Sequence, residues 1–131
     1  MKIKLYFLAL FIFLCIDALW LGLVAPGFYR SQIGHLMAET PNLFAAGIFY
    51  LLFVGALVYF IIEPALRTGT TRDALARGAL FGLVTYATYD LTNLATLRDW
   101  PLLVTVVDLV WGTILTAATA AASVWAGKKI L

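Results

Sequence analysis

Three aspartates lie inside stretches that are otherwise apolar enough for a lipid bilayer: Asp17, Asp90 and Asp108. A charged side chain in a bilayer is costly, so such residues usually face the protein interior and mark a functional site. Buried carboxyl groups can act as general acids or bases, relay protons or bind cations. The sequence therefore predicts chemistry or binding within a membrane, with Asp90 as the central acid or base and the other two acids tuning its proton affinity.

Residues three or four positions apart share one face of a helix, and this spacing predicts the neighbours of each acid. The expected ligand-binding side chains on these faces are Trp20, Trp111, Tyr86, Asn93 and Thr105. Arg30 and His35 lie in the loop above and could meet an anionic headgroup. The alternative is structural: the acids fix helix packing through hydrogen bonds, and the two tryptophans belong to an aromatic belt at the membrane surface.

The composition agrees with a membrane protein. Of 131 residues, 63% are hydrophobic and 12% are charged, whereas about a quarter are charged in a soluble domain. Four apolar runs each approach the roughly 20 residues that a helix needs to cross a bilayer. We therefore predict an all-α integral membrane protein, a four-helix antiparallel transmembrane bundle that forms one domain over residues 1–131, with spans at about 5–25, 42–62, 74–97 and 102–126.

Turn and cap residues predict where these helices begin and end. Pro26-Gly27 should end the first span and Glu63-Pro64 the second. Thr40-Pro41 reads as an N-cap followed by proline at the first helical position, and Thr70 or Thr71 can cap the third span. An apolar stripe within residues 28–37 is consistent with a short helix on the bilayer surface in the first outer loop.

The basic residues predict the orientation. With four spans, seven of the nine Lys and Arg residues fall on one side, and only Arg30 and Arg98 fall on the other. Because Lys and Arg mark the cytoplasmic side, both termini should be cytoplasmic. At the helical rise, all three acids would then lie about 9–12 Å below the outer surface. We expect at least one of them to be protonated, or a cation, Arg30 or Arg98 to neutralise one.

Small residues predict close helix contacts. Gly78 and Gly82 form a GxxxG pattern, and small residues recur every four positions in the fourth span at Gly112, Thr116 and Ala120. Such faces let helix backbones approach closely in lipid. The partner could be another helix of the chain, a second copy in a homo-oligomer, or a different membrane protein.

Several of these segments together resemble a known family. Residues 17–22, the run from Tyr89 to Leu97, Trp100-Pro101, and Asp108 with Trp111-Gly112 are similar to a family of small bacterial predicted membrane proteins, domain of unknown function 2177. The resemblance covers nearly the whole chain. It implies a four-span protein of the bacterial inner membrane and supplies no established activity.

Three functions from different classes are compatible with these residues. The first is an outward-facing carboxylate pocket that binds or modifies an amphiphilic, lipid-like ligand, with membrane lipids as partners. The alternatives are proton- or cation-coupled transport and an accessory subunit of a membrane enzyme. Whether the protein is an enzyme stays open, and no cofactor is assigned. The net charge of +2 does not suggest nucleic acid, and no metal is assigned, although Asp17, Asp90, Asp108 and His35 have the oxygen and nitrogen donors of a weak candidate site.

Overall fold

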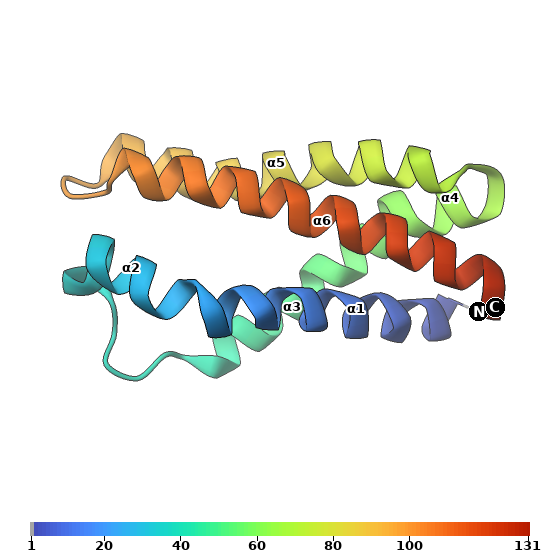
Figure 1. Ribbon diagram of the computed structural model, residues 1–131, viewed down its shortest axis with the longest axis horizontal. Coiled ribbons are helices and arrows are strands. Elements are labelled where there is room, and N and C mark those ends of the chain that lie inside the picture. The colour runs from blue at the N-terminus through green and yellow to red at the C-terminus, as the bar shows by residue number, and fades with distance from the viewer. Residues whose placement is uncertain (1) are drawn as a thin grey trace.

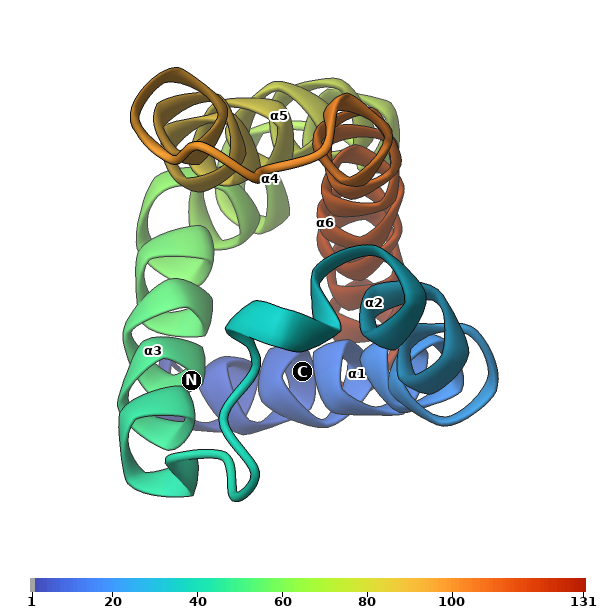
Figure 2. The same cartoon turned by 90° about the vertical axis from the view of Figure 1, so that its left-hand side faces the viewer.

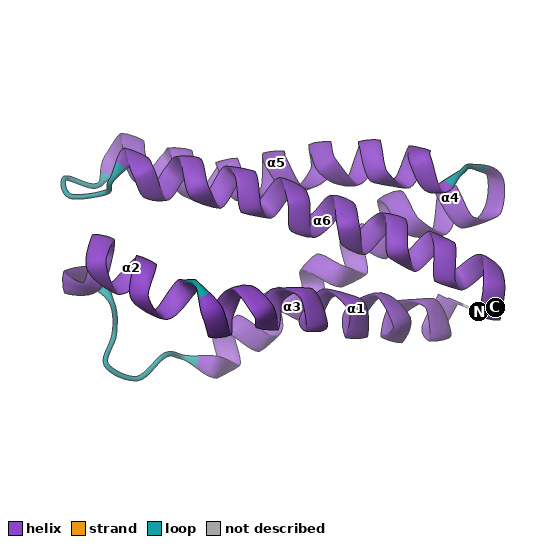
Figure 3. Cartoon of the chain, in the orientation of Figure 1, coloured by secondary structure: helices purple, strands orange, loops and turns teal. Residues whose placement is uncertain are grey.

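The computed structural model describes residues 2–131, and all regular structure in that range is helical (Figure 3). Helix α1 spans Lys2–Leu23 and α2 spans Ala25–Ile33, followed by the 3₁₀ turn η1 at Gly34–Leu36. One continuous helical segment follows, made of α3 (Leu43–Leu57), the π-helical turn η2 (Val58–Ile62) and α4 (Glu63–Thr68). Helix α5 spans Thr71–Thr96 and α6 spans Leu102–Ile130.

Four long helical segments run along the length of the molecule: α1, the α3–α4 segment, α5 and α6 (Figure 1). Seen end-on, they lie around a common interior (Figure 2). The N- and C-termini lie together at one end, which we call the terminal end. Helix α2 and the turn between α5 and α6 lie at the opposite end, which we call the loop end.

Three of these segments are long and apolar enough to cross a membrane: α1, the α3–α4 segment and α6. Helix α5, which contains the predicted third span, has 26 residues but is not among them. Its second half carries Asp90 and Asn93 together with several threonines and tyrosines, which lower its apolar character. The chain is thus an all-helical membrane protein with three candidate spans, and the crossing of α5 stays a prediction.

The observed N-caps show which polar residues start the helices. The prediction of Thr40 was wrong, because Asn42 caps α3 by accepting a hydrogen bond at 3.0 Å from the backbone N–H of Ala45. The prediction of Thr70 is confirmed. Its hydroxyl accepts from the N–H of Asp73 at 3.1 Å, and the Asp73 carboxylate accepts from the N–H of Thr70 at 2.9 Å. The backbone N–H groups of Thr70 and Asp73, which have no partner within the helix, are therefore both hydrogen-bonded.

Two prolines behave differently from the expectation. Helix α1 ends at Leu23, but Pro26 lies in the first turn of α2 rather than in a loop. The second helical segment does not end at Glu63-Pro64 and continues to Thr68. In the π-helical turn before it, the N–H of Glu63 bonds to the carbonyl of Val58. Pro64 then falls in the first turn of α4, where its missing N–H and fixed φ are tolerated.

The same π-helical turn keeps one face of this segment in the core. Val54, Val58 and Ile62 are all buried and recur every four residues. Four residues turn an α-helix about 40° beyond one full turn, so residues at this spacing would move progressively off one face of a regular helix. The π-helical turn has more residues per turn, so it keeps Val54, Val58 and Ile62 on the same face. These residues pack with fully buried side chains of α1 and α6, including Leu5, Phe13 and Leu115, and fill the interior with apolar groups.

Helices α5 and α6 pack through their small residues. A Cβ atom at Gly78 would lie 2.8 Å from the side chain of Ala120, and one at Gly82 would lie 2.3 Å from the carbonyl oxygen of Gly112. The GxxxG pattern of α5 therefore meets the small face of α6 within the same chain. Because both faces are buried in this contact, association with another protein would have to use other surfaces.

Candidate functional site

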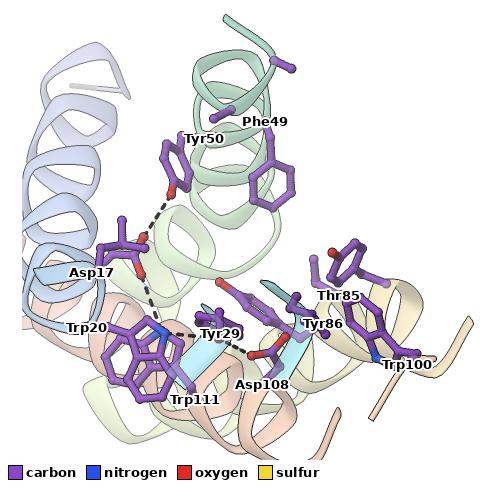
Figure 4. Close-up of a pocket in the computed structure, with 15 residues that line it drawn as sticks. Asp17, Trp20, Tyr29, Phe49, Tyr50, Thr85, Tyr86, Trp100, Asp108 and Trp111 are labelled. Atoms are coloured by element: carbon purple, nitrogen blue, oxygen red, sulfur yellow. Dashed lines mark hydrogen bonds between the residues drawn. The ribbon is translucent and has the colours of Figure 1, made fainter. Parts of the chain in front are cut away.

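A cavity of about 760 Å³ lies between the helices (Figure 4). Residues of α1, α2, α3, α5, α6 and the α5–α6 turn contribute to its wall. Eight of the fifteen lining residues are aromatic and two are aspartates. The lining consists of Asp17, Trp20, Leu21, Tyr29, Ile33, Ala45, Ala46, Phe49, Tyr50, Thr85, Tyr86, Tyr89, Trp100, Asp108 and Trp111.

Asp17 joins three helices at the cavity wall. Its side chain is buried, and its two carboxylate oxygens accept different hydrogen bonds. The hydroxyl of Tyr50 donates to Oδ2 at 3.2 Å, and the indole N–H of Trp111 donates to Oδ1 at 3.4 Å. Both bonds are drawn in Figure 4. The acid of α1 is therefore held by α3 and α6 at once.

Asp108 is buried on α6 and is held by α2. It accepts a hydrogen bond from the hydroxyl of Tyr29, whose oxygen in turn accepts from the indole N–H of Trp20 at 3.3 Å. Burial raises the pKa of the Tyr29 phenol, and the neighbouring Asp108 carboxylate raises it further. Tyr29 therefore stays protonated at neutral pH and can donate to Asp108 permanently.

The two tryptophans that follow the acids form one aromatic wall. The rings of Trp20 and Trp111 stack with centroids 4.6 Å apart and an angle of 10° between their planes. Each indole N–H also belongs to the hydrogen-bonding system of an acid on the other helix: Trp111 donates to Asp17 directly, and Trp20 reaches Asp108 through Tyr29. The shared Asp-x-x-Trp spacing of α1 and α6 thus produces a reciprocal arrangement.

Asp90 is placed differently from the other two acids. Its side chain is completely inaccessible, it does not line the cavity, and neither carboxyl oxygen has a hydrogen-bond partner. It lies beside Asp108, close enough for the two carboxyl groups to interact. The indole of Trp100 is also near, but its N–H donates to Thr105 at 3.1 Å. Asp90 therefore touches the cavity only through its neighbour.

The remaining predicted residues divide into two groups. Tyr86 lines the cavity and lies near all three acids, close enough to interact with them electrostatically. Thr105 is buried behind the wall, where it orients Trp100. Asn93, Arg30 and His35 are outside the lining. Arg30 and His35 are exposed, and His35 Nε2 lies 3.8 Å from a carboxylate oxygen of Asp99.

The three acids do not form a common set of metal ligands. Across residues 2–131, no three His, Cys, Asp or Glu side chains come close enough together to hold a metal ion. The arrangement is a pair, Asp90 with Asp108, and a separate Asp17. The weak metal candidate therefore receives no support from the geometry.

The sequence reasoning missed two tyrosines and one helix. Tyr50 and Phe49 place α3 in the wall, whereas no site residue was expected in the second span. The signal was present, because Ala46, Phe49, Tyr50 and Phe53 share one helix face. Tyr29 was not among the expected site residues, and its bond to Asp108 could not be predicted because it depends on how α2 packs against the long helices.

The helical structure and its three segments of membrane-spanning length define an all-helical membrane protein, with buried acids beside a cavity between the helices. Comparison with known protein families identifies the family of this chain. The chain belongs to the family described as "predicted membrane protein (DUF2177)", whose model matches residues 2–125, and this confirms the resemblance seen in the motifs. No curated protein and no solved structure matches the chain.

Proposed function

We propose that the protein is a four-span protein of the bacterial inner membrane whose cavity binds or modifies an amphiphilic, lipid-like ligand. The observation that carries this proposal is the cavity itself. Its volume of about 760 Å³ falls within the roughly 300–1,000 Å³ typical of small-molecule sites. A mostly apolar wall with a few converging polar groups is also typical of such sites, and here the polar groups are Asp17 and Asp108.

Within this proposal the acids have different tasks. Asp17 and Asp108 face the ligand, because both are in the lining. Asp90 acts through Asp108 as a positioning residue and can exchange a proton with it. Trp20 and Trp111 provide the aromatic wall. A general acid or base at this place would be Asp108, which combines access to the cavity with a neighbouring carboxyl group.

The position of the termini supports a crossing by α5. Three crossings would place the two ends of the chain on opposite sides of a membrane, whereas both termini lie at the terminal end (Figure 1). A fourth crossing by α5 agrees with this arrangement. The excess of Lys and Arg near the terminal end then orients that end to the cytoplasm, and the cavity opens toward the outer leaflet.

The interior favours a binding site over a conduit. Fully buried apolar side chains from α1, the α3–α4 segment and α6 pack together. Among residues 2–131, the buried polar side chains of α6 beyond Gly112 are Thr116, Thr119 and Ser123, which carry no charge. Ion or proton transport would need an ionisable group or water in this region. Transport is therefore secondary to ligand binding.

A cavity-filling variant tests the proposal. Ala46→Trp places a large ring in the cavity wall, and Gly47→Trp places the same ring on the next residue of α3, where an added Cβ meets no atom within 4 Å. Each protein would be purified in mild detergent, and its bound lipids extracted and quantified by mass spectrometry. We expect a lipid-like species at a fixed ratio to the wild type and the Gly47→Trp control, and its loss from Ala46→Trp. Equal retention in all three proteins would contradict the proposal.

A further inference from the structure

The acids of the site have only neutral hydrogen-bond donors. Asp17 is held by Tyr50 and Trp111, and Asp108 is held by Tyr29. The ion-pair contacts within residues 2–131 are His35 with Asp99 and Arg67 with Glu63. No Lys, Arg or His of the described chain therefore forms an ion pair with the carboxyl group of Asp17, Asp90 or Asp108.

The cavity wall is equally free of basic groups. None of the fifteen lining residues is Lys, Arg or His, while two are acidic and eight are aromatic. We expected Arg30 and His35 to meet an anionic headgroup, but both are exposed and outside the lining. An anionic ligand group in this cavity would face two carboxyl groups without a compensating charge.

Aromatic rings and carboxylates together form a suitable environment for a cation. Ammonium groups are attracted to the faces of Trp and Tyr rings, most strongly where water is excluded. Trp20 and Trp111 lie stacked beside Asp17, and Tyr86 lies near all three acids. In addition, the completely buried Asp90 has two carboxyl oxygens without hydrogen-bond partners beside Asp108. No positive charge of the protein balances the acids of the site, and a ligand could supply one.

We propose that the polar end of the ligand is an ammonium group, which binds between Asp17, Asp108 and the aromatic wall while its apolar chain fills the rest of the cavity. This inference rests on the proposed binding of a lipid-like ligand and specifies its headgroup. An aminophospholipid and a hydrophobic amine share this chemistry. An amphiphile that carries only a phosphate, sulfate or carboxylate does not fit.

Four probes with the same alkyl chain separate the headgroup from the chain: dodecylamine, dodecyltrimethylammonium, dodecanol and dodecyl phosphate. Each would be titrated by calorimetry into the purified full-length protein held in amphipol, with Ala46→Trp as the background for partitioning. We expect both ammonium probes to bind about tenfold more tightly than dodecanol, since a charged hydrogen bond from the primary ammonium, or cation–π attraction of the quaternary one, contributes about one such factor. Dodecyl phosphate should bind more weakly than dodecanol.

Substitutions of single acids test whether the preference for ammonium probes arises in the cavity. Asp17→Asn and Asp108→Asn should each reduce the ratio of ammonium affinity to dodecanol affinity about tenfold. Asp99→Asn is the matched control, because Asp99 is an exposed acid outside the lining. Displacement of dodecylamine by phosphatidylethanolamine but not by phosphatidylglycerol would support a membrane-lipid source, and displacement by neither would support a free amine.

The wild-type comparison needs no substitution and keeps the test decisive if a variant fails to fold. Dodecyl phosphate binding as tightly as dodecylamine would overturn the ammonium assignment while the cavity remained a lipid-like site. A preference that persists in both Asp17→Asn and Asp108→Asn, or that is lost in Asp99→Asn, would overturn it too. If none of the four probes bound above the Ala46→Trp background, the proposed function itself would fail.

Discussion

Tyr29 shows how a single residue connects separate parts of the site. It lies on a short helix outside the long segments, yet its hydroxyl donates to Asp108 and accepts from Trp20. Because burial and the adjacent carboxylate raise the pKa of this phenol, it remains a donor at neutral pH. This one side chain therefore connects α2 to both α1 and α6.

Tyr29→Phe tests this connection. The substitution keeps the ring and leaves Asp108 without its donor, so we expect a loss of about 1–3 kcal/mol in the free energy of unfolding. Denaturation of the purified protein, followed by circular dichroism, measures the change. Tyr59→Phe is the control, because Tyr59 is 71% exposed and its change should stay within about 0.5 kcal/mol. An equal effect of both substitutions would mean that the Tyr29 hydroxyl has no special role.

At the scale of elements, sequence patterns predicted helices better than their ends. Thr70, one of the two threonines expected to cap the third span, caps α5. The start of α3 was missed because Asn42, after Pro41, offers a cap as good as Thr40. The continuation past Pro64 could not be foreseen, because it depends on a π-helical turn that tertiary packing selects.

The candidate site, like the helices, could be predicted only in part from the sequence. The spacing of Asp17 with Trp20 and of Asp108 with Trp111 indicated two faces, and the structure brings both to one cavity. The separate position of Asp90, behind Asp108, could not be read from spacing alone because depth along a helix axis does not give rotation about it. The role of Tyr50 depends on how α3 tilts against α1, which is a property of the packed molecule.

The contact between α5 and α6 gives a prediction at the same scale. A methyl group at Gly82 would approach the Gly112 carbonyl oxygen to 2.3 Å and the Thr116 side chain to 2.6 Å, so the helices would have to separate. We expect Gly82→Ala to lower the free energy of unfolding by about 2 kcal/mol. At Gly47, where an added Cβ meets no atom within 4 Å, the same substitution should not destabilise the protein. Stability equal to wild type in Gly82→Ala would contradict the observed closeness of these helices.

For the whole molecule, the proposed topology depends on a membrane crossing by α5. Its two ends lie at opposite ends of the structure (Figure 1), near the exposed residues Arg72 and Asp99. The proposed topology places Arg72 in the cytoplasm and Asp99 outside. The alternative, in which only the three more apolar segments cross, would place both on the same side.

Labelling of introduced cysteines distinguishes the two topologies. After replacement of the exposed Cys15 by serine, Arg72→Cys and Asp99→Cys would be treated in intact spheroplasts with a maleimide that cannot cross membranes. We expect labelling of Asp99→Cys alone, and labelling of both after the membrane is permeabilised. Labelling of both, or of neither, in intact spheroplasts would rule out a crossing by α5.

The wide turn at Val58–Ile62 accommodates one residue more than an α-helical path between Tyr50 and Ile62 would need. Deletion of Phe60 would restore an unbroken α-helix, in which the seven steps from Val54 to Ile62 turn through about 700°, close to two full turns. Both halves of the segment would then keep their faces, and the Tyr50 hydroxyl would stay directed at Asp17. The wide turn therefore absorbs one extra residue, so a single deletion there should be tolerated, whereas a second would rotate the two halves relative to each other by about 100°.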